Sequence, residues 1–363
     1  MSLPVTPAFA AIETAVYGDG CQRFSQGIDT INRLHDLLHA HYPGLRCRVY
    51  TNAASRLICY EMPDLRFDGE PAAYFGYWES RDDVAAAREL FERCRADLRA
   101  NAIRRLVGPI NFSTFFDYRV RLDNFDRLNY PGEPHNPPYY AALLESCGFH
   151  LVEKYFSIHT DSVSAPLQRL RHKAGRVLER EHPFAIVPLH EFDIEKYLAQ
   201  VYRLIDQSFR EALAYVPLAE NVFRLTFDRA AIARYCHATS CVALLNGEAV
   251  GLLLSLPDWA ELDAATKAQI MHGAATLDAA LHGDRLAVRR AYIKTICVKP
   301  ELRNSGLYAH LFVYFLNNCQ NRYAQAGGAL MRLGNAANKL ALDLFDDERS
   351  TRIEYGLYAR TLE

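Results

Sequence analysis

Residues 291–311, near the C-terminus, constrain the fold of this chain more than any other stretch. They open with a short run of β-branched and aromatic residues that ends at Pro300, where a strand loses a backbone donor. A polar segment, 301–305, leads to Gly306, and apolar residues then recur at helical spacing from Leu307 to Phe315. The stretch therefore predicts a strand, a tight turn and a helix.

The start of that helix favours an anion. The first amides of a helix have no partner within it and point beyond its N-terminus. Gly306 lets the backbone come close to a bulky oxyanion such as a pyrophosphate. By itself the pattern is equally typical of an ordinary strand–turn–helix connection, so the surrounding residues have to decide between the two interpretations.

The residues of this turn also form a motif. The run Val298-x-Pro300-x-x-Arg303-x-x-Gly306 resembles the acyl-CoA-binding motif of the GCN5-related N-acetyltransferases (GNATs). In that family, Gln or Arg-x-x-Gly-x-Gly or Ala follows a strand that ends in Val-x-Pro. The match is partial, because Tyr308 stands where Gly or Ala is usual.

A second resemblance lies one predicted strand further on. After a strand over residues 329–333, Asn338-x-x-Ala341-x-x-x-Phe345 is similar to the family pattern Asn-x-x-Ala-x-x-x-Tyr. In the family the Asn helps to hold CoA, and the Tyr often protonates the departing thiolate. Phe345 cannot donate a proton, so the resemblance leaves the proton donor of this chain open.

The resemblance implies an acyl-CoA, by preference acetyl-CoA, as co-substrate, and no metal. A backbone amide near Cys297 would polarise the thioester carbonyl; the Cys297 thiol itself is interpreted as a buried strand residue rather than a nucleophile. The residues expected to contact CoA are Ile296, Cys297, Val298, Arg303, Asn304, Ser305, Gly306, Leu307, Tyr308 and Asn338.

Candidates for the acid–base groups are few. Asp258, just after a predicted hairpin strand, and Glu301, beside the turn, are possible bases, although both also fit ordinary structural carboxylates. The candidate proton donors, none of which is singled out by its spacing, are Tyr308, Tyr323, Tyr355 and Tyr358. Tyr215 lies in the segment 210–224, which covers the acceptor site in the family, and is a candidate contact to the acceptor.

The length of 363 residues suits two domains. We expect an α/β protein of two tandem GNAT-like domains, each a mixed central sheet flanked by helices. Residues 1–163 form the first domain, 164–183 a connecting helix and 184–363 the second domain. In the first, Glu79, Asp82 and Asp83 occupy the turn where phosphates would sit, so this domain is expected to be degenerate and not to bind CoA.

Composition excludes several classes. The net charge of -2 disfavours a nucleic-acid partner, and the basic run 169–176 is interpreted as the solvated face of the connecting helix. No apolar run is long enough for a membrane span, and the first residues do not form a signal peptide. Nine cysteines without a Cys-x-x-Cys pair fit reduced thiols, and we therefore expect a cytoplasmic protein.

The functional hypothesis is direct N-acyl transfer from acyl-CoA to an amine of a small molecule or a peptide. One alternative is an aminoacyl or long-chain acyl transferase of the tandem type. Another is a non-catalytic sensor that binds acyl-CoA or a metabolite, which Tyr308 and Phe345 favour. Pairing of two copies into a homodimer is left open.

Overall fold

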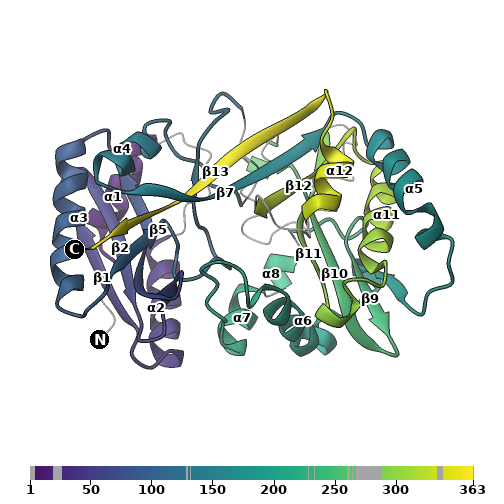
Figure 1. Ribbon diagram of the computed structural model, residues 1–363, viewed down its shortest axis with the longest axis horizontal. Helices are drawn as coiled ribbons and strands as arrows, with labels where there is room; N and C mark the ends of the chain where they lie inside the picture. Colours follow the sequence, from purple (N-terminus) through teal and green to yellow (C-terminus); the bar gives the residue numbers. More distant parts are fainter. Residues whose placement is uncertain are drawn as a thin grey trace.

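The computed structural model describes residues 5–18, 27–127, 130, 132–227, 229–232, 234–259, 262–263, 265–266, 288–332 and 338–362. Helices flank both faces of a large mixed sheet, so the predicted α/β class is confirmed (Figure 1). The strand order in the sheet is β1-β2-β4-β5-β13-β7-β12-β11-β10-β9-β8, while β3 pairs with β4 and β6 with β13.

The first half of the chain runs to the end of β7. Its elements are α1 (Pro7–Tyr17), α2 (Ile28–His41), β1 (Arg46–Thr51), β2 (Ser55–Glu61), β3 (Arg66–Phe67), β4 (Glu70–Ser80), α3 (Val84–Arg99), β5 (Arg105–Gly108), β6 (Val120–Arg121), α4 (Tyr140–Ser146) and β7 (His150–Thr160). Helix α3 begins where expected, because the Asp83 carboxylate accepts a hydrogen bond from Ala86 N at 2.9 Å and caps the helix.

The second half repeats this order. It contains α5 (Ser164–Leu178), β8 (Ala185–Pro188), η1 (Leu189–Glu191), α6 (Ile194–Phe209), α7 (Glu220–Thr226), α8 (Arg229–Ile232), β9 (Cys241–Leu245), β10 (Glu248–Pro257), β11 (Arg290–Val298), η3 (Pro300–Leu302), α11 (Leu307–Cys319), β12 (Gln325–Arg332), α12 (Lys339–Phe345) and β13 (Ser350–Thr361). Asn246 and Gly247 form the predicted two-residue turn of the β9–β10 hairpin, both with positive φ.

Each half contains antiparallel strands followed by a parallel strand–helix–strand unit. These units are β4–α3–β5 and β11–α11–β12, and in each the two strands pair in parallel. A shorter helix and a long closing strand follow, α4 and β7 in the first half and α12 and β13 in the second. β13 runs without interruption from Ser350 to Thr361.

The closing strands are exchanged between the halves. β13 lies between β5 and β7, and β7 lies between β13 and β12, so each half is completed by a strand from the other. The C-terminus therefore lies in the first half, where the yellow β13 runs toward β5 (Figure 1). One hydrophobic core cluster contains residues of both halves, among them Leu38 of α2 and Leu204 of α6, so the halves share a core on that face.

Helix α5 covers the opposite face of the second half. It packs against α11 and α12, and its residues Leu167 and Leu170 are buried with Leu311 and Phe315 of α11. The connection 164–183 was expected to be helical, and α5 ends at Leu178. The predicted strand 329–333 begins earlier, at Gln325, and Leu333 lies outside the described residues, as do His272 and His282 of the long insertion.

Candidate functional site

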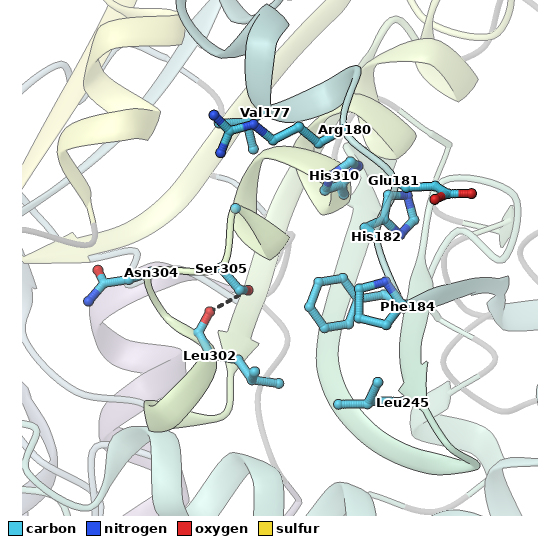
Figure 2. Close-up of a pocket in the computed structure, with 12 residues that line it drawn as sticks. Val177, Arg180, Glu181, His182, Phe184, Leu245, Leu302, Asn304, Ser305 and His310 are labelled. Atoms are coloured by element: carbon cyan, nitrogen blue, oxygen red, sulfur yellow. Dashed lines mark hydrogen bonds between the residues drawn. The ribbon is translucent and has the colours of Figure 1, made fainter.

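The predicted strand–turn–helix is present at the end of β11. After β11 the chain makes the short helix η3, and Gly306 then adopts φ +85° immediately before α11. Ser305 Oγ donates to Leu302 O at 2.7 Å and accepts from Leu307 N at 3.3 Å, which holds the turn closed (Figure 2). Asn304 and Ser305 are exposed, so the start of the helix can be reached from solvent.

The turn borders a cavity of about 340 Å³ (Figure 2). One wall is the turn itself with His310 of α11, and the other is the chain that leaves α5. The lining residues are Val177, Arg180, Glu181, His182, Pro183, Phe184, Leu245, Leu302, Asn304, Ser305, Gly306 and His310. The linker between the two halves thus supplies much of the cavity wall.

Only glycine fits at the centre of this turn. A Cβ built on Gly306 would lie 2.3 Å from Cγ1 of Val177, which is too close for two carbon atoms. The positive φ adds backbone strain for any other residue. Glycine at position 306 therefore allows α5 to pack on the turn.

Two histidines lie side by side in the cavity wall. The ring centroids of His182 and His310 are 4.1 Å apart, and His310 is buried while His182 is exposed. Burial lowers the pKa of His310, and the neighbouring His182 lowers it further. Arg180 and Glu181 lie in the same wall, so the cavity carries side chains of both charges.

Strands β11 and β12 separate close to this turn. Their parallel pairing extends only from Arg290 with Gln325 to Ile293 with Gly328. β12 then follows β7, whereas β11 continues along β10 to Val298. In the register of the described strands, residues 294–298 have no partner in β12, and we call this gap in the strand pairing the opening.

A β-bulge lies where the two strands separate. Thr295 is opposite Leu254 and Ile293 is opposite Ser255, so Lys294 is an extra residue in β11. The bulge directs the Lys294 side chain toward the first half, where Nζ donates to Gly132 O at 3.0 Å and to Glu133 Oε1 at 3.3 Å. Charged side chains from the two halves therefore meet at the opening.

The corresponding opening in the first half is closed. β4 and β5 pair only from Ala72 to Tyr74, and the chain after β5 fills the space beyond. Ile110 N donates to Phe75 O at 2.6 Å, and the Asn111 carbonyl oxygen Oδ1 accepts from Tyr77 N at 2.7 Å. With Asp83 bonded to the first turn of α3, both the opening and the helix start already have partners within the protein.

Behind Lys294 lies a buried cluster that we call the junction cluster: Arg119, Glu133 and Lys294. Arg119 Nη2 donates to Glu133 Oε2 at 3.3 Å, so this carboxylate bridges two cations. Glu133 and Arg119 expose 0% and 1% of their side chains, and Lys294 19%. Burial lowers the pKa of Lys294, and the Glu133 charge opposes that shift.

Aromatic rings surround the arginine of the junction cluster. The Arg119 guanidinium carbon lies 4.0 Å from the ring centre of Tyr118, 5.1 Å from that of Tyr155 and 5.3 Å from that of Tyr355. Sequence analysis missed the junction cluster. The available signal was Lys294, a charged residue in an otherwise β-prone apolar run.

The residues expected to contact CoA lie along β11 and the turn. Cys297 is buried, and burial raises the pKa of its thiol to about 12, which fits a structural role. Arg303 Nη2 is 3.5 Å from Ser208 O of α6. Burial also raises the pKa of Tyr308, Cys297 raises it further and Arg303 opposes the shift. Val298 and Leu307 are buried in one hydrophobic core cluster, and Ile296 packs against it.

The second motif lies at the start of α12. Asn338 is the residue before the helix, and its Nδ2 donates to Arg332 O at 3.1 Å. Phe345 is fully buried, with its ring centre 6.3 Å from that of Phe312. The position that carries a phenol in the family is therefore part of the core in this chain.

The acid–base candidates have different environments. Asp258 is buried, and its Oδ2 accepts from Arg290 Nη1 at 2.9 Å, as expected of a structural carboxylate. Glu301 is exposed at the surface. Tyr355 is buried beside the junction cluster, and burial raises its pKa well above the usual value. Asp258 and Tyr355 both influence the pKa of Tyr292, so they share one neighbourhood.

Tyr215 lies where the second half docks on the first. Its Oη is 3.4 Å from Asp206 Oδ1 of α6. The next residue, Val216, exchanges two hydrogen bonds with Ser113, through its N at 3.0 Å and its O at 2.9 Å. Contact of Tyr215 with an acceptor, like the other site assignments, stays a prediction.

The basic run on α5 is largely used within the second half. Arg169 forms an ion pair with Asp347 at 2.9 Å, and Lys173 with Asp343 at 2.8 Å. Arg171 Nη2 donates to Asn317 Oδ1 at 3.1 Å. These contacts fasten α5 to α11 and α12.

The described part of the chain also bears on membrane-spanning helices and metal sites. There, no helix is both long and apolar enough to cross a membrane. Nor do three or more His, Cys, Asp or Glu side chains in that part come together in a group able to hold a metal ion.

Comparison with known sequences gives a short match. No family model matches the chain. The protein YghO of Escherichia coli (strain K12) is 27% identical over 82 residues, which are 23% of this chain. The match spans only 21% of the length of YghO.

Solved structures are similar over nearly the whole chain. A tandem GNAT protein from the clavulanic acid biosynthesis pathway has a TM-score of 0.49 and 12% identity, covering 98% of this chain and 95% of that one. The GCN5-related glucosamine N-acetyltransferase region of a fungal multi-domain GH3 β-N-acetylglucosaminidase has a TM-score of 0.46 and 11% identity, covering 96% of this chain and 37% of that one.

Proposed function

We propose that this protein is an acyl-CoA-dependent N-acyltransferase whose co-substrate binds to the second half. One observation carries the proposal: β11 and β12 separate after Ile293, and β11 then leads into a turn that places Gly306 at the start of α11. An opened pair of strands beside an accessible helix start suits a ligand with an extended amide chain and a phosphate group.

The phosphates would bind at the turn. The side chains of Asn304 and Ser305 are exposed there, and Arg180 lines the neighbouring cavity. The pantetheine arm contains two amides, which would pair with the backbone of residues 294–298 at the opening. From Val298 to Lys294 the strand spans roughly 13 Å, so an arm anchored at the turn brings its thioester close to the bulge.

Acyl transfer then requires three groups. A backbone amide of β11 would polarise the thioester carbonyl, the acceptor has to arrive as a free amine, and the departing thiolate takes up a proton. The acceptor, an amine of a small molecule or a peptide, would approach from the face that carries α6 and the junction between the halves. Acetyl-CoA is the first acyl donor to test.

The first half is proposed to have no CoA site. Asn111 and Ile110 fill its strand opening, and Asp83 caps the helix start with a negative charge. A phosphate there would replace a hydrogen-bonded carboxylate and meet its charge. The role proposed for this half is to complete the sheet and supply one side of the junction.

A non-catalytic sensor of acyl-CoA is the second candidate. The observation in its favour is the buried Phe345, which replaces the phenol of the family motif with a core side chain. Binding without release of free thiol, across a broad panel of amines, would support this candidate over the enzyme.

Calorimetric titration with acetyl-CoA tests the proposal. We expect one site per chain, with binding weakened by Ser305→Glu, because a carboxylate beside the turn repels the phosphates. Asp161→Glu serves as the control, because residue 161 is far from the turn in the sequence and the substitution leaves the net charge unchanged. Absence of binding by the unaltered protein would overturn the proposal. Thiol release with an amine panel then separates the enzyme from the sensor.

A further inference from the structure

Lys294 has an unusual setting for a lysine within a strand. It is the extra residue of a β-bulge, and its ammonium is held by Gly132 O and by Glu133, both from the first half. The carboxylate of Glu133 also receives Arg119, so its position is fixed from two sides. A lysine fixed in this way has lost most of its rotamer freedom before any ligand binds.

The bulge coincides with the point where the strands part. Ile293 is the last residue of β11 that pairs with β12, and Lys294 follows it. If the phosphates of acyl-CoA bind at the turn, as proposed above, the arm runs back along β11 and its reactive end arrives at this residue. Within the junction cluster, Lys294 is the member that keeps some exposure, whereas Glu133 and Arg119 are buried.

We propose that Lys294 contacts the thioester and donates the proton to the departing sulfur, and that Glu133 is its positioning residue. This inference rests on the proposed function. Lys294 would then provide the proton that Phe345 cannot provide, because Phe345 is buried against Phe312. It also makes acyl transfer dependent on both halves, since the acid comes from one and the group that holds it from the other.

The step balances without a further reactant. The free amine attacks the carbonyl carbon, a C–N bond forms, and the C–S bond breaks as the tetrahedral intermediate collapses. The Lys294 ammonium gives its proton to sulfur, so CoA leaves as a thiol. The nitrogen of the acceptor loses one proton as it becomes an amide, and that proton restores the Lys294 ammonium.

The charges around Lys294 suit proton transfer. Glu133 and Asp117 favour its protonated form, while burial and Arg119 favour the neutral form. The three charged groups, Glu133, Asp117 and Arg119, all come from the first half. Burial has the largest effect, so the amine gives up its proton more readily than a lysine in water.

The test is affinity labelling with bromoacetyl-CoA, which needs no knowledge of the acceptor. A neutral lysine nitrogen displaces bromide, forming a C–N bond, and the proton goes to solvent. We expect peptide mapping to find the label on Lys294, and free CoA to protect it. Lys299 is a matched control: it lies five residues further along, exposes 18% of its side chain and pairs with Glu248 at 2.6 Å. Lys299 should stay unlabelled.

The variants separate position from chemistry. Lys294→Met should abolish the label while calorimetry still detects CoA binding, and Lys299→Met should change nothing in the labelling. In Glu133→Gln the carboxylate that raises the pKa of Lys294 is lost. The labelling midpoint, which is the pH at which labelling is half-maximal, should therefore move to lower pH. A midpoint that stays at its value in the unaltered protein would overturn the role of Glu133. Thermal melting of each variant confirms that it is folded.

The outcomes are distinct. If CoA binds but the label falls on Cys297 or Tyr308, or on no residue, the role of Lys294 is overturned while the proposed function stands. If the unaltered protein does not bind CoA, both fall. Once an acceptor is found, Lys294→Gln should lower kcat by ~10²–10⁴-fold with little change in KM.

Discussion

Tyr155 and Tyr355 are directly paired in the β7–β13 ladder, one residue from each half of the chain. Both rings face the guanidinium of Arg119, at 5.1 Å and 5.3 Å from its carbon to the ring centres. The pair marks the middle of the sheet, where the exchanged strands meet and the junction cluster begins. The proposed chemistry is therefore placed at the contact between the two halves rather than inside one of them.

Breaking the junction cluster should destabilise the protein strongly. Glu133→Gln leaves Arg119 without its carboxylate in a fully buried position, and such a loss costs about 3 kcal/mol or more in the free energy of unfolding. Glu220→Gln is the control, because its pair with Arg224 is nearly half exposed and is worth less than about 1 kcal/mol. Urea denaturation measures both; equal effects would contradict a tightly held cluster.

Gly306→Ala should lower the free energy of unfolding by about 1–2 kcal/mol from the positive φ alone. The contact with Val177 adds to this loss. Val177→Ala removes that contact but not the backbone strain, so the double variant should recover only part of the loss. Urea titration of the two single variants and the double variant gives the coupling. Full recovery would mean that the φ of Gly306 carries no strain.

Phe345→Tyr should destabilise the protein without creating an acid. The new hydroxyl would enter the core next to Phe312, and an unsatisfied buried hydroxyl costs about 1–3 kcal/mol. The same change at Phe116, which is only half-buried, should have a smaller effect. Thermal melting and thiol release are the measurements. Faster thiol release with an unchanged melting temperature would place residue 345 at the reactive site and not in the core.

Stability should fall as the pH drops below about 6.5, and His159 should cause part of that fall. Burial, with Arg290 and Arg127 nearby, lowers the pKa of His159 to about 3. Below about pH 6.5 the unfolded chain therefore binds a proton at His159 that the folded protein does not bind. Each pH unit below about 6.5 lowers the free energy of unfolding by up to about 1.4 kcal/mol. Its ring nitrogen Nδ1 is hydrogen-bonded to the Tyr130 hydroxyl. His159→Gln should flatten the pH dependence measured by urea denaturation at about pH 7.5 and 5.5; an unchanged slope would contradict this assignment.

Local signals in the sequence predicted local structure well. Asn246-Gly247 predicted a tight hairpin turn, and the residues around Pro300 and Gly306 predicted the turn before α11, because both depend on backbone preferences of a few adjacent residues. The acidic start of α3 was also informative, since Asp83 caps that helix. These features need no knowledge of distant contacts.

Features that depend on distant pairing were not predicted. Glu133 and Lys294 are 161 residues apart, and nothing in the spacing of residues 119, 133 and 294 relates them. The packing of Val177 against Gly306 has the same character, because it depends on how α5 crosses α11. The exchange of β7 and β13 was missed for a related reason: two similar strands have the same pattern whichever half they join.

The strand exchange sets an order on the synthesis of the protein. β5 pairs with residues 358–361 at the end of β13, so this edge of the first half stays without its partner until the end of β13 has left the ribosome. A nascent chain therefore carries an open strand edge throughout translation of the second half. For the same reason the two halves should not fold when expressed as separate fragments, but they should recover the native sheet when the fragments are synthesised together in one cell.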